Sequence, residues 1–143
     1  PRQAQGRGPA GRRQGLIRLS VRWWRWILAS VMTAGLAFAL RPLAPSEGPE
    51  NWFPHADKMF HLLFFALLWW MGQRARLGSA GRLALGLMAF AVGIELAQAL
   101  FTATRSASPT DVAADGLGLL AGAWLNRRLE AVTLGRQPEE DGR

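Results

Sequence analysis

The chain has 143 residues, of which 50% are hydrophobic, with no cysteine, seven tryptophans and a formal net charge of +7. The length suits one domain, and the lack of cysteine excludes disulfides, thiolate metal sites and cysteine nucleophiles. The positive charge alone would suit nucleic-acid binding. The basic residues, however, lie between long apolar runs, a pattern typical of a membrane protein, so no nucleic-acid partner is predicted.

The N-terminal segment, residues 1–22, is rich in Arg, Gly, Gln and Pro and shows no apolar periodicity. We expect it to be a disordered basic tail. Because the apolar runs that follow indicate a membrane, the partner expected for this tail is anionic lipid. Residues 129–143 are similarly polar, and we expect them to form a second tail.

Four apolar blocks lie between the tails, at residues 23–40, 59–72, 83–101 and 112–125. The first and third blocks approach the roughly 20 residues that a helix needs to cross a bilayer. The other two become long enough if their helices include the polar residues that precede them. We therefore predict an all-α transmembrane four-helix bundle over residues 23–128, with short helices that have polar outer ends. A soluble helical protein is the alternative, but little of the sequence could form a polar outer face.

The basic residues alternate between the two ends of the predicted bundle. Of the 17 Lys and Arg residues, 14 lie in or beside the N-terminal tail, in the connection at residues 73–82, or in the C-terminal tail. The other two connections contain only Arg41, Lys58 and Arg105. By the positive-inside rule, both termini are predicted to be cytoplasmic.

Residues 23–40 also have an alternative interpretation as a cleaved signal peptide. A basic segment precedes this apolar block, and Ala37 and Ala39 form a possible A-x-A cleavage site. The basic segment is very long for a signal peptide, however, and Pro42 would follow close behind the cleavage point. A first transmembrane helix is therefore the favoured interpretation.

Polar and charged residues gather at the outer ends of the predicted helices. Charged groups inside a membrane are costly and usually need partners, and the inner ends have no comparable set. Asp57 and His61 share one helix face, as do Asp111 and Asp115, because both pairs are four residues apart. We predict that the following residues form a ligand-binding polar cluster: Asp57, Lys58, His61, Glu95, Gln98, Arg105, Asp111 and Asp115.

Some of these residues also have purely structural interpretations. Ser108 fits the N-cap of the fourth helix, and Asp111 fits the matching position of a capping box. Glu95 and Asp115 lie too far inside their helices to act as caps. A structural ion-pair network is the alternative to a ligand site for these two carboxylates. The candidate partners for Asp115 are Arg105, Lys58, His61 or a bound cation.

The fourth helix also contains the G-x-x-x-G pattern of Gly118 and Gly122. Asp111, Asp115 and these glycines follow one another at intervals of four, three and four residues, so they form one stripe along the helix. In a membrane helix, this pattern predicts close packing of the backbone against a neighbouring helix.

The stretches DKMFH and ELAQALFTATRSASPTDVAADGLGLLAG resemble the VanZ-like family of small bacterial membrane proteins. D-K-x-x-H, E-x-x-Q, an Arg, a Ser, an Asp and G-x-x-x-G occur in the family's order across residues 25–126. The resemblance implies a multi-pass protein of the bacterial inner (cytoplasmic) membrane with a role in the cell envelope. It further implies a link to antibiotic resistance, through tolerance to the glycopeptide teicoplanin. The family commonly has Asn where this chain has Asp115, which puts in doubt any role that needs a neutral amide there.

The favoured function is a non-enzymatic envelope protein whose polar cluster binds an amphiphilic or lipid-linked ligand among the membrane lipids. In this hypothesis, Lys58 and Arg105 contact phosphate on the ligand. No spacing in the chain predicts a metal or another cofactor as a resident group.

Two alternatives remain open. The first is a membrane enzyme acting on a lipid-linked substrate, with His61 or Glu95 as general acid or base. In that version, a divalent ion held by Asp57, Asp111 and Asp115 is conceivable, since oxygen ligands suit Mg²⁺ or Ca²⁺. The second is an accessory subunit of a larger membrane complex or homo-oligomer. A transporter is disfavoured because the polar residues lie at one end of the bundle and not at the midplane.

Overall fold

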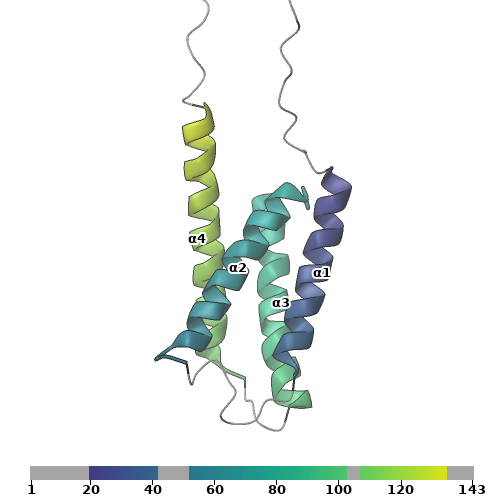
Figure 1. Ribbon diagram of the computed structural model, residues 1–143, viewed down its shortest axis with the longest axis vertical. Coiled ribbons are helices and arrows are strands. Elements are labelled where there is room, and N and C mark those ends of the chain that lie inside the picture. Colours follow the sequence, from purple (N-terminus) through teal and green to yellow (C-terminus); the bar gives the residue numbers. More distant parts are fainter. Residues whose placement is uncertain (1–19, 42–51, 103–106, 135–143) are drawn as a thin grey trace, which may run out of the picture.

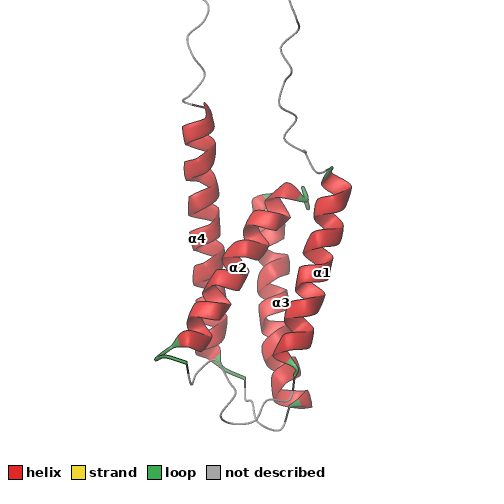
Figure 2. Cartoon of the chain, in the orientation of Figure 1, coloured by secondary structure: helices red, strands yellow, loops and turns green. Residues whose placement is uncertain are grey.

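The computed structural model describes residues 20–41, 52–102 and 107–134. These ranges contain four helices and no strand: α1 (Val21–Ala39), α2 (Ala56–Arg74), α3 (Ala80–Phe101) and α4 (Pro109–Leu134). The prediction of an all-α chain with four helices is thus confirmed. Successive helices run in opposite directions (Figures 1 and 2). We call the end where α1 begins and α4 finishes the tail end, and the opposite end the cluster end.

The helices include the polar residues that precede the second and fourth apolar blocks. α2 begins at Ala56 and α4 at Pro109, each three residues before its apolar block. His55 precedes α2 in a left-handed conformation, with φ of 62°. α4 also continues past its apolar block to Leu134. The charged residues at the cluster end therefore have positions fixed by regular helix.

Among the described residues, α3 is the one helix that is long and apolar enough to cross a membrane by length and composition. Its most apolar window has a mean hydropathy of 1.9, and only 33% of that window is buried inside the bundle. Ionisable residues near the ends of the other helices lower their mean hydropathy. The predicted four-span membrane bundle therefore remains a prediction.

The tightest packing in the bundle is between α2 and α4, which share the most extensive helix–helix contact. A Cβ on Gly118 would collide with the backbone carbonyl of Leu62. A Cβ on Gly122 would lie 2.9 Å from the carbonyl oxygen of Ala66 and 3.0 Å from the Cβ of Trp69. The two glycines thus allow the α4 backbone to lie directly against α2 over about one helical turn.

The apolar core fills the space between α2 and α3, with Phe65, Leu68 and Ala91 almost wholly buried. α1 contributes less to it: Leu28 and Ala39 are its buried residues. The Gln98 side chain of α3 donates a hydrogen bond of 3.1 Å to the carbonyl of Ala39. This bond satisfies one of the carbonyls that the end of a helix leaves unpaired, and it joins α1 to α3 at the cluster end.

We expect Gly118→Ala to destabilise the protein by about 1–3 kcal/mol, because the new methyl group meets backbone that cannot rotate away. Gly116→Ala in the same helix is the matched control, since its Cβ would meet nothing closer than the Met88 sulfur at 3.9 Å. This control should be neutral or stabilising by up to about 1 kcal/mol, from the higher helix propensity of alanine. Thermal unfolding of the purified proteins measures both effects, and equal stability of the two variants would contradict the close α2–α4 contact.

Candidate functional site

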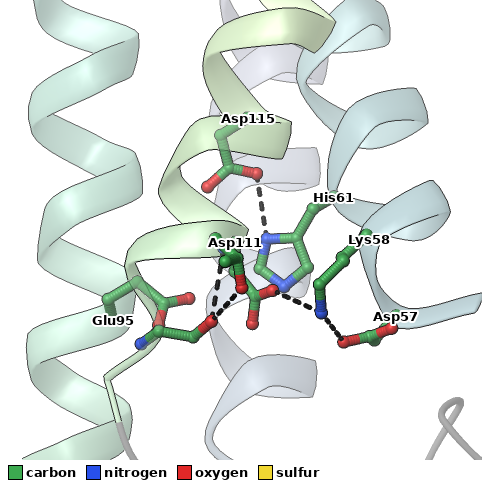
Figure 3. A network of polar contacts seen from close by, with 8 residues as sticks. Asp57, Lys58, His61, Glu95, Asp111 and Asp115 are labelled. Atoms are coloured by element: carbon green, nitrogen blue, oxygen red, sulfur yellow. Dashed lines mark hydrogen bonds and ion pairs between the residues drawn. The ribbon is translucent and has the colours of Figure 1, made fainter. Parts of the chain in front are cut away.

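The structure brings seven of the eight predicted cluster residues together at the cluster end. They come from three helices, and Figure 3 shows six of them facing one another. The seven are Asp57, Lys58 and His61 on α2, Glu95 and Gln98 on α3, and Asp111 and Asp115 on α4. Arg105 lies outside the described residues.

Asp115 is paired with His61 across the α2–α4 contact. The imidazole Nδ1 of His61 lies 2.9 Å from Oδ1 of Asp115, whose side chain is 1% exposed. An ionised carboxylate only accepts hydrogen bonds. With Asp115 ionised and the imidazole neutral, Nδ1 therefore carries the proton and Nε2 keeps its lone pair. His61 is thus the partner of Asp115 among the candidates that the sequence left open.

Lys58 lies between two carboxylates on different helices. Its Nζ is 2.7 Å from Oδ2 of Asp57 and 3.3 Å from Oδ1 of Asp111. All three side chains are partly exposed, at 35%, 28% and 16% for Lys58, Asp57 and Asp111. The ion pairs connect the first turns of α2 and α4 at the edge of the cluster.

Glu95 binds the start of α4. One carboxylate oxygen, Oε2, accepts a 2.7 Å hydrogen bond from the backbone N–H of Ser108. Ser108 Oγ in turn accepts a 3.3 Å bond from the N–H of Asp111, which is the N-cap interaction expected from the sequence. In a complete capping box, the Asp111 carboxylate would accept a hydrogen bond from the Ser108 N–H. Here Glu95 of α3 accepts that bond instead, and the Asp111 carboxylate faces Lys58.

Two carboxylate oxygens in the cluster are buried without a hydrogen-bond partner among the described residues. They are Oε1 of Glu95 and Oδ1 of Asp111. The Asp111 oxygen lies within ion-pair distance of Lys58 but receives no hydrogen bond of good geometry. Within the described ranges, the Glu95 oxygen has no such neighbour, and Glu95 as a whole is 3% exposed. Buried polar atoms are normally paired, so each of these exceptions needs an explanation.

A cavity of about 430 Å³ adjoins the cluster. Its apolar wall comes from α1 and α2 and from one residue of α3: Gly35, Phe38, Ala39, Phe60, Phe64, Phe65 and Ile94. Its polar rim consists of Asp57, Lys58, His61, Gln98, Ser108 and Asp111. The aromatic wall was not predicted from the sequence, although Phe60 and Phe64 are four residues apart and therefore share one face of α2.

The protein is a small helical bundle whose four described helices alternate in direction. Its α2–α4 pair is packed closely through two glycines, and a ligand-sized pocket beside the polar cluster lies at one end. Residues 15–130 match the family model described as VanZ/LLP1, and the chain belongs to this family. No curated protein and no solved structure matches the chain.

We expect Asp115→Leu to destabilise the protein by about 1–3 kcal/mol, because it leaves the buried N–H of His61 without an acceptor. Asp115→Asn is the conservative control, since its amide oxygen can still accept that hydrogen bond. Adding His61→Phe to Asp115→Leu should restore part of the lost stability by removing the unpaired group. Thermal unfolding of the four proteins tests this, and a stable Asp115→Leu protein would mean that the pair is dispensable.

Proposed function

We propose that this chain is a multi-pass protein of the bacterial cytoplasmic membrane, with the cluster end facing outward. Many large apolar side chains are exposed on three helices, and extensive exposed apolar surface marks a site of contact with a membrane or another protein. Lipid tails would cover these side chains without cost. They include Leu63 and Leu67 of α2, Leu85, Leu96 and Leu100 of α3, and Leu117, Leu120 and Trp124 of α4.

Aromatic and basic side chains at the tail end support the proposed orientation. The rings of Trp24 and Trp70 pack edge to face with centroids 5.2 Å apart. The guanidinium of Arg74 lies 4.8 Å from the Trp70 ring centroid, and Arg25 donates a 3.2 Å hydrogen bond to the Ala75 carbonyl. Tryptophans with an excess of Lys and Arg are typical of the cytoplasmic interface of a membrane protein.

Single-cysteine labelling tests this orientation without background, because the chain has no natural cysteine. Phe53 and Leu77 lie three residues beyond the opposite ends of α2 and are similarly exposed, at 44% and 45%. In intact spheroplasts, a membrane-impermeant maleimide should label Phe53→Cys and should label Leu77→Cys only after permeabilisation. Equal labelling of both variants before permeabilisation would rule out the proposed topology.

We further propose that the cavity binds an amphiphilic or lipid-linked ligand, and one observation carries this proposal. A single cavity combines an aromatic wall with a rim of charged side chains. An acyl or isoprenoid chain would lie along Phe38, Phe60 and Phe64, while the head group would meet the polar rim. Pockets of a few hundred Å³ with a mainly apolar lining and a few polar groups are the usual form of small-molecule sites.

The charges of the cluster favour a head group that donates hydrogen bonds. The described residues of the cluster include four carboxylates and one lysine, and the two carboxylates nearest to Lys58 already engage it. Lys58 is therefore poorly placed to bind an isolated phosphate, which differs from the role first expected for it. Hydroxyl or amino groups, as on a sugar or an amino-lipid, would find acceptors in Asp57 and Asp111. Binding of a phosphate would instead depend on Arg105 or on a bound cation.

Mass spectrometry of the lipids that remain bound to the purified protein tests the ligand proposal. We expect Phe38→Ser to reduce the retained amphiphile several-fold, because Phe38 forms part of the cavity wall. Phe101→Ser is the matched control, since this residue is 76% exposed and does not line the cavity. The same pair, expressed in a teicoplanin-sensitive host, tests a link to glycopeptide tolerance. Equal retention of the same lipids by both variants would count decisively against ligand binding in this cavity.

A membrane enzyme is the second candidate function, and the His61–Asp115 pair is the observation that favours it. A carboxylate that orients an imidazole while the other nitrogen remains available is the arrangement of a general base and its orienting group. Turnover of a retained lipid by the purified protein, lost in His61→Gln, would distinguish an enzyme from a binding protein.

A further inference from the structure

We propose that His61, Glu95 and Asp111 form a binding site for a divalent transition-metal ion. Each offers one ligand atom, and the three atoms lie within 4.8 Å of one another. The residues come from α2, α3 and α4 respectively, so the site would join all three helices. One imidazole nitrogen with two carboxylate oxygens suits Zn²⁺ and its first-row neighbours, whereas Mg²⁺ and Ca²⁺ prefer oxygen ligands alone.

Two buried carboxylate oxygens that receive no hydrogen bond from the described residues supply further support for a cation. Among the described residues, Oε1 of Glu95 and Oδ1 of Asp111 have no hydrogen-bond partner although both are buried, and Glu95 is only 3% exposed. Its other oxygen is already held by the Ser108 N–H, which fixes the carboxylate with Oε1 free. A bound ion would satisfy both oxygens and offset the negative charge of the buried carboxylates.

His61 is prepared for metal binding by its hydrogen bond to Asp115. With Nδ1 held at 2.9 Å from the Asp115 carboxylate, Nε2 is the nitrogen left to coordinate. Figure 3 shows this nitrogen on the side of the ring that faces Asp111. A carboxylate behind a metal-bound histidine fixes the ring and makes it a stronger ligand. This role gives a physical reason for a carboxylate at Asp115, deep inside α4.

The site requires only local side-chain movement. Ligand atoms on one Zn²⁺ ion lie about 3–3.5 Å apart, given bonds of about 2.0–2.2 Å. To bind the ion, the three ligand atoms would therefore move closer to one another by about 1–2 Å, through rotation of their side chains. The ion would displace Lys58 from Asp111, and Lys58 would keep its 2.7 Å contact with Asp57.

The proposed ligand set differs from the oxygen-only set considered from the sequence. In the structure, Lys58 lies closer to Asp57, at 2.7 Å, than to Asp111, at 3.3 Å, and Asp115 is paired with His61. Asp111 is therefore the member of that set that joins the proposed site. Three protein ligands leave a coordination position open, as in catalytic zinc sites. His61 and Asp111 both line the cavity, so the open position would face any ligand bound there.

Zinc titration of the purified full-length protein, stripped with a chelator and competed against a chromophoric indicator, tests the site. We expect one Zn²⁺ per chain, and affinities at least about 100-fold lower for His61→Gln and Glu95→Gln. Asp115→Asn should weaken binding by about 10–100-fold, as removal of an outer partner typically does. The matched controls are His55→Asn and Glu130→Gln, which change exposed residues outside the proposed site and should bind Zn²⁺ like the wild type.

Thermal unfolding with and without Zn²⁺ separates loss of the site from loss of the fold. The wild type and both controls should be stabilised by Zn²⁺, whereas His61→Gln and Glu95→Gln should unfold cooperatively but show no shift on adding the metal. A wild-type protein that binds Zn²⁺ no tighter than these two variants would overturn the proposal, as would equal losses in the controls. Because only the metal is added, either result leaves the lipid-ligand proposal to be decided by its own experiment.

Discussion

The contact between the α4 backbone at Gly118 and the α2 carbonyl of Leu62 is the constraint on which the rest of the cluster depends. It sets the distance between the two helices to that of touching backbones. His61 is next to Leu62 in the chain, and Asp115 lies one turn before Gly118. The close approach therefore brings the imidazole to 2.9 Å from a carboxylate that is 1% exposed. That carboxylate is tolerated in an apolar bundle because the same contact that buries it also supplies its donor.

The third helix completes the cluster. Glu95 accepts the Ser108 N–H, so α3 fixes where α4 begins and leaves Asp111 free to face Lys58. This arrangement satisfies the helix start but leaves two buried carboxylate oxygens without a hydrogen bond from any described residue. Excess buried acid beside a cavity is a poor site for an isolated phosphate and a good one for a cation or for hydrogen-bond donors. The proposed amphiphilic ligand and the proposed metal ion therefore both rest on this excess of carboxylates beside the cavity.

The four helices, their order and the gathering of polar residues at one end could be predicted from the sequence. Apolar blocks separated by polar segments predict helices locally, and four-residue spacing shows which residues share a face, as for Asp57 and His61. The family could also be predicted, since its motifs are read along the chain, and the match over residues 15–130 confirms it. The membrane topology, derived from the distribution of basic residues, stays a prediction.

The sequence by itself therefore determined the helices and the members of the cluster, because periodicity and charge are properties of neighbouring residues. Only the tertiary structure decided which of these side chains form pairs. The contacts between helices depend on how far each helix is rotated about its axis and how closely it crosses the next. These contacts are the bond of Glu95 to the Ser108 N–H, the pair of His61 with Asp115, and the aromatic wall of the cavity. Spacing within one helix carries no information about that rotation, so the sequence leaves several candidate partners for Asp115. The packing of α4 against α2 selects His61.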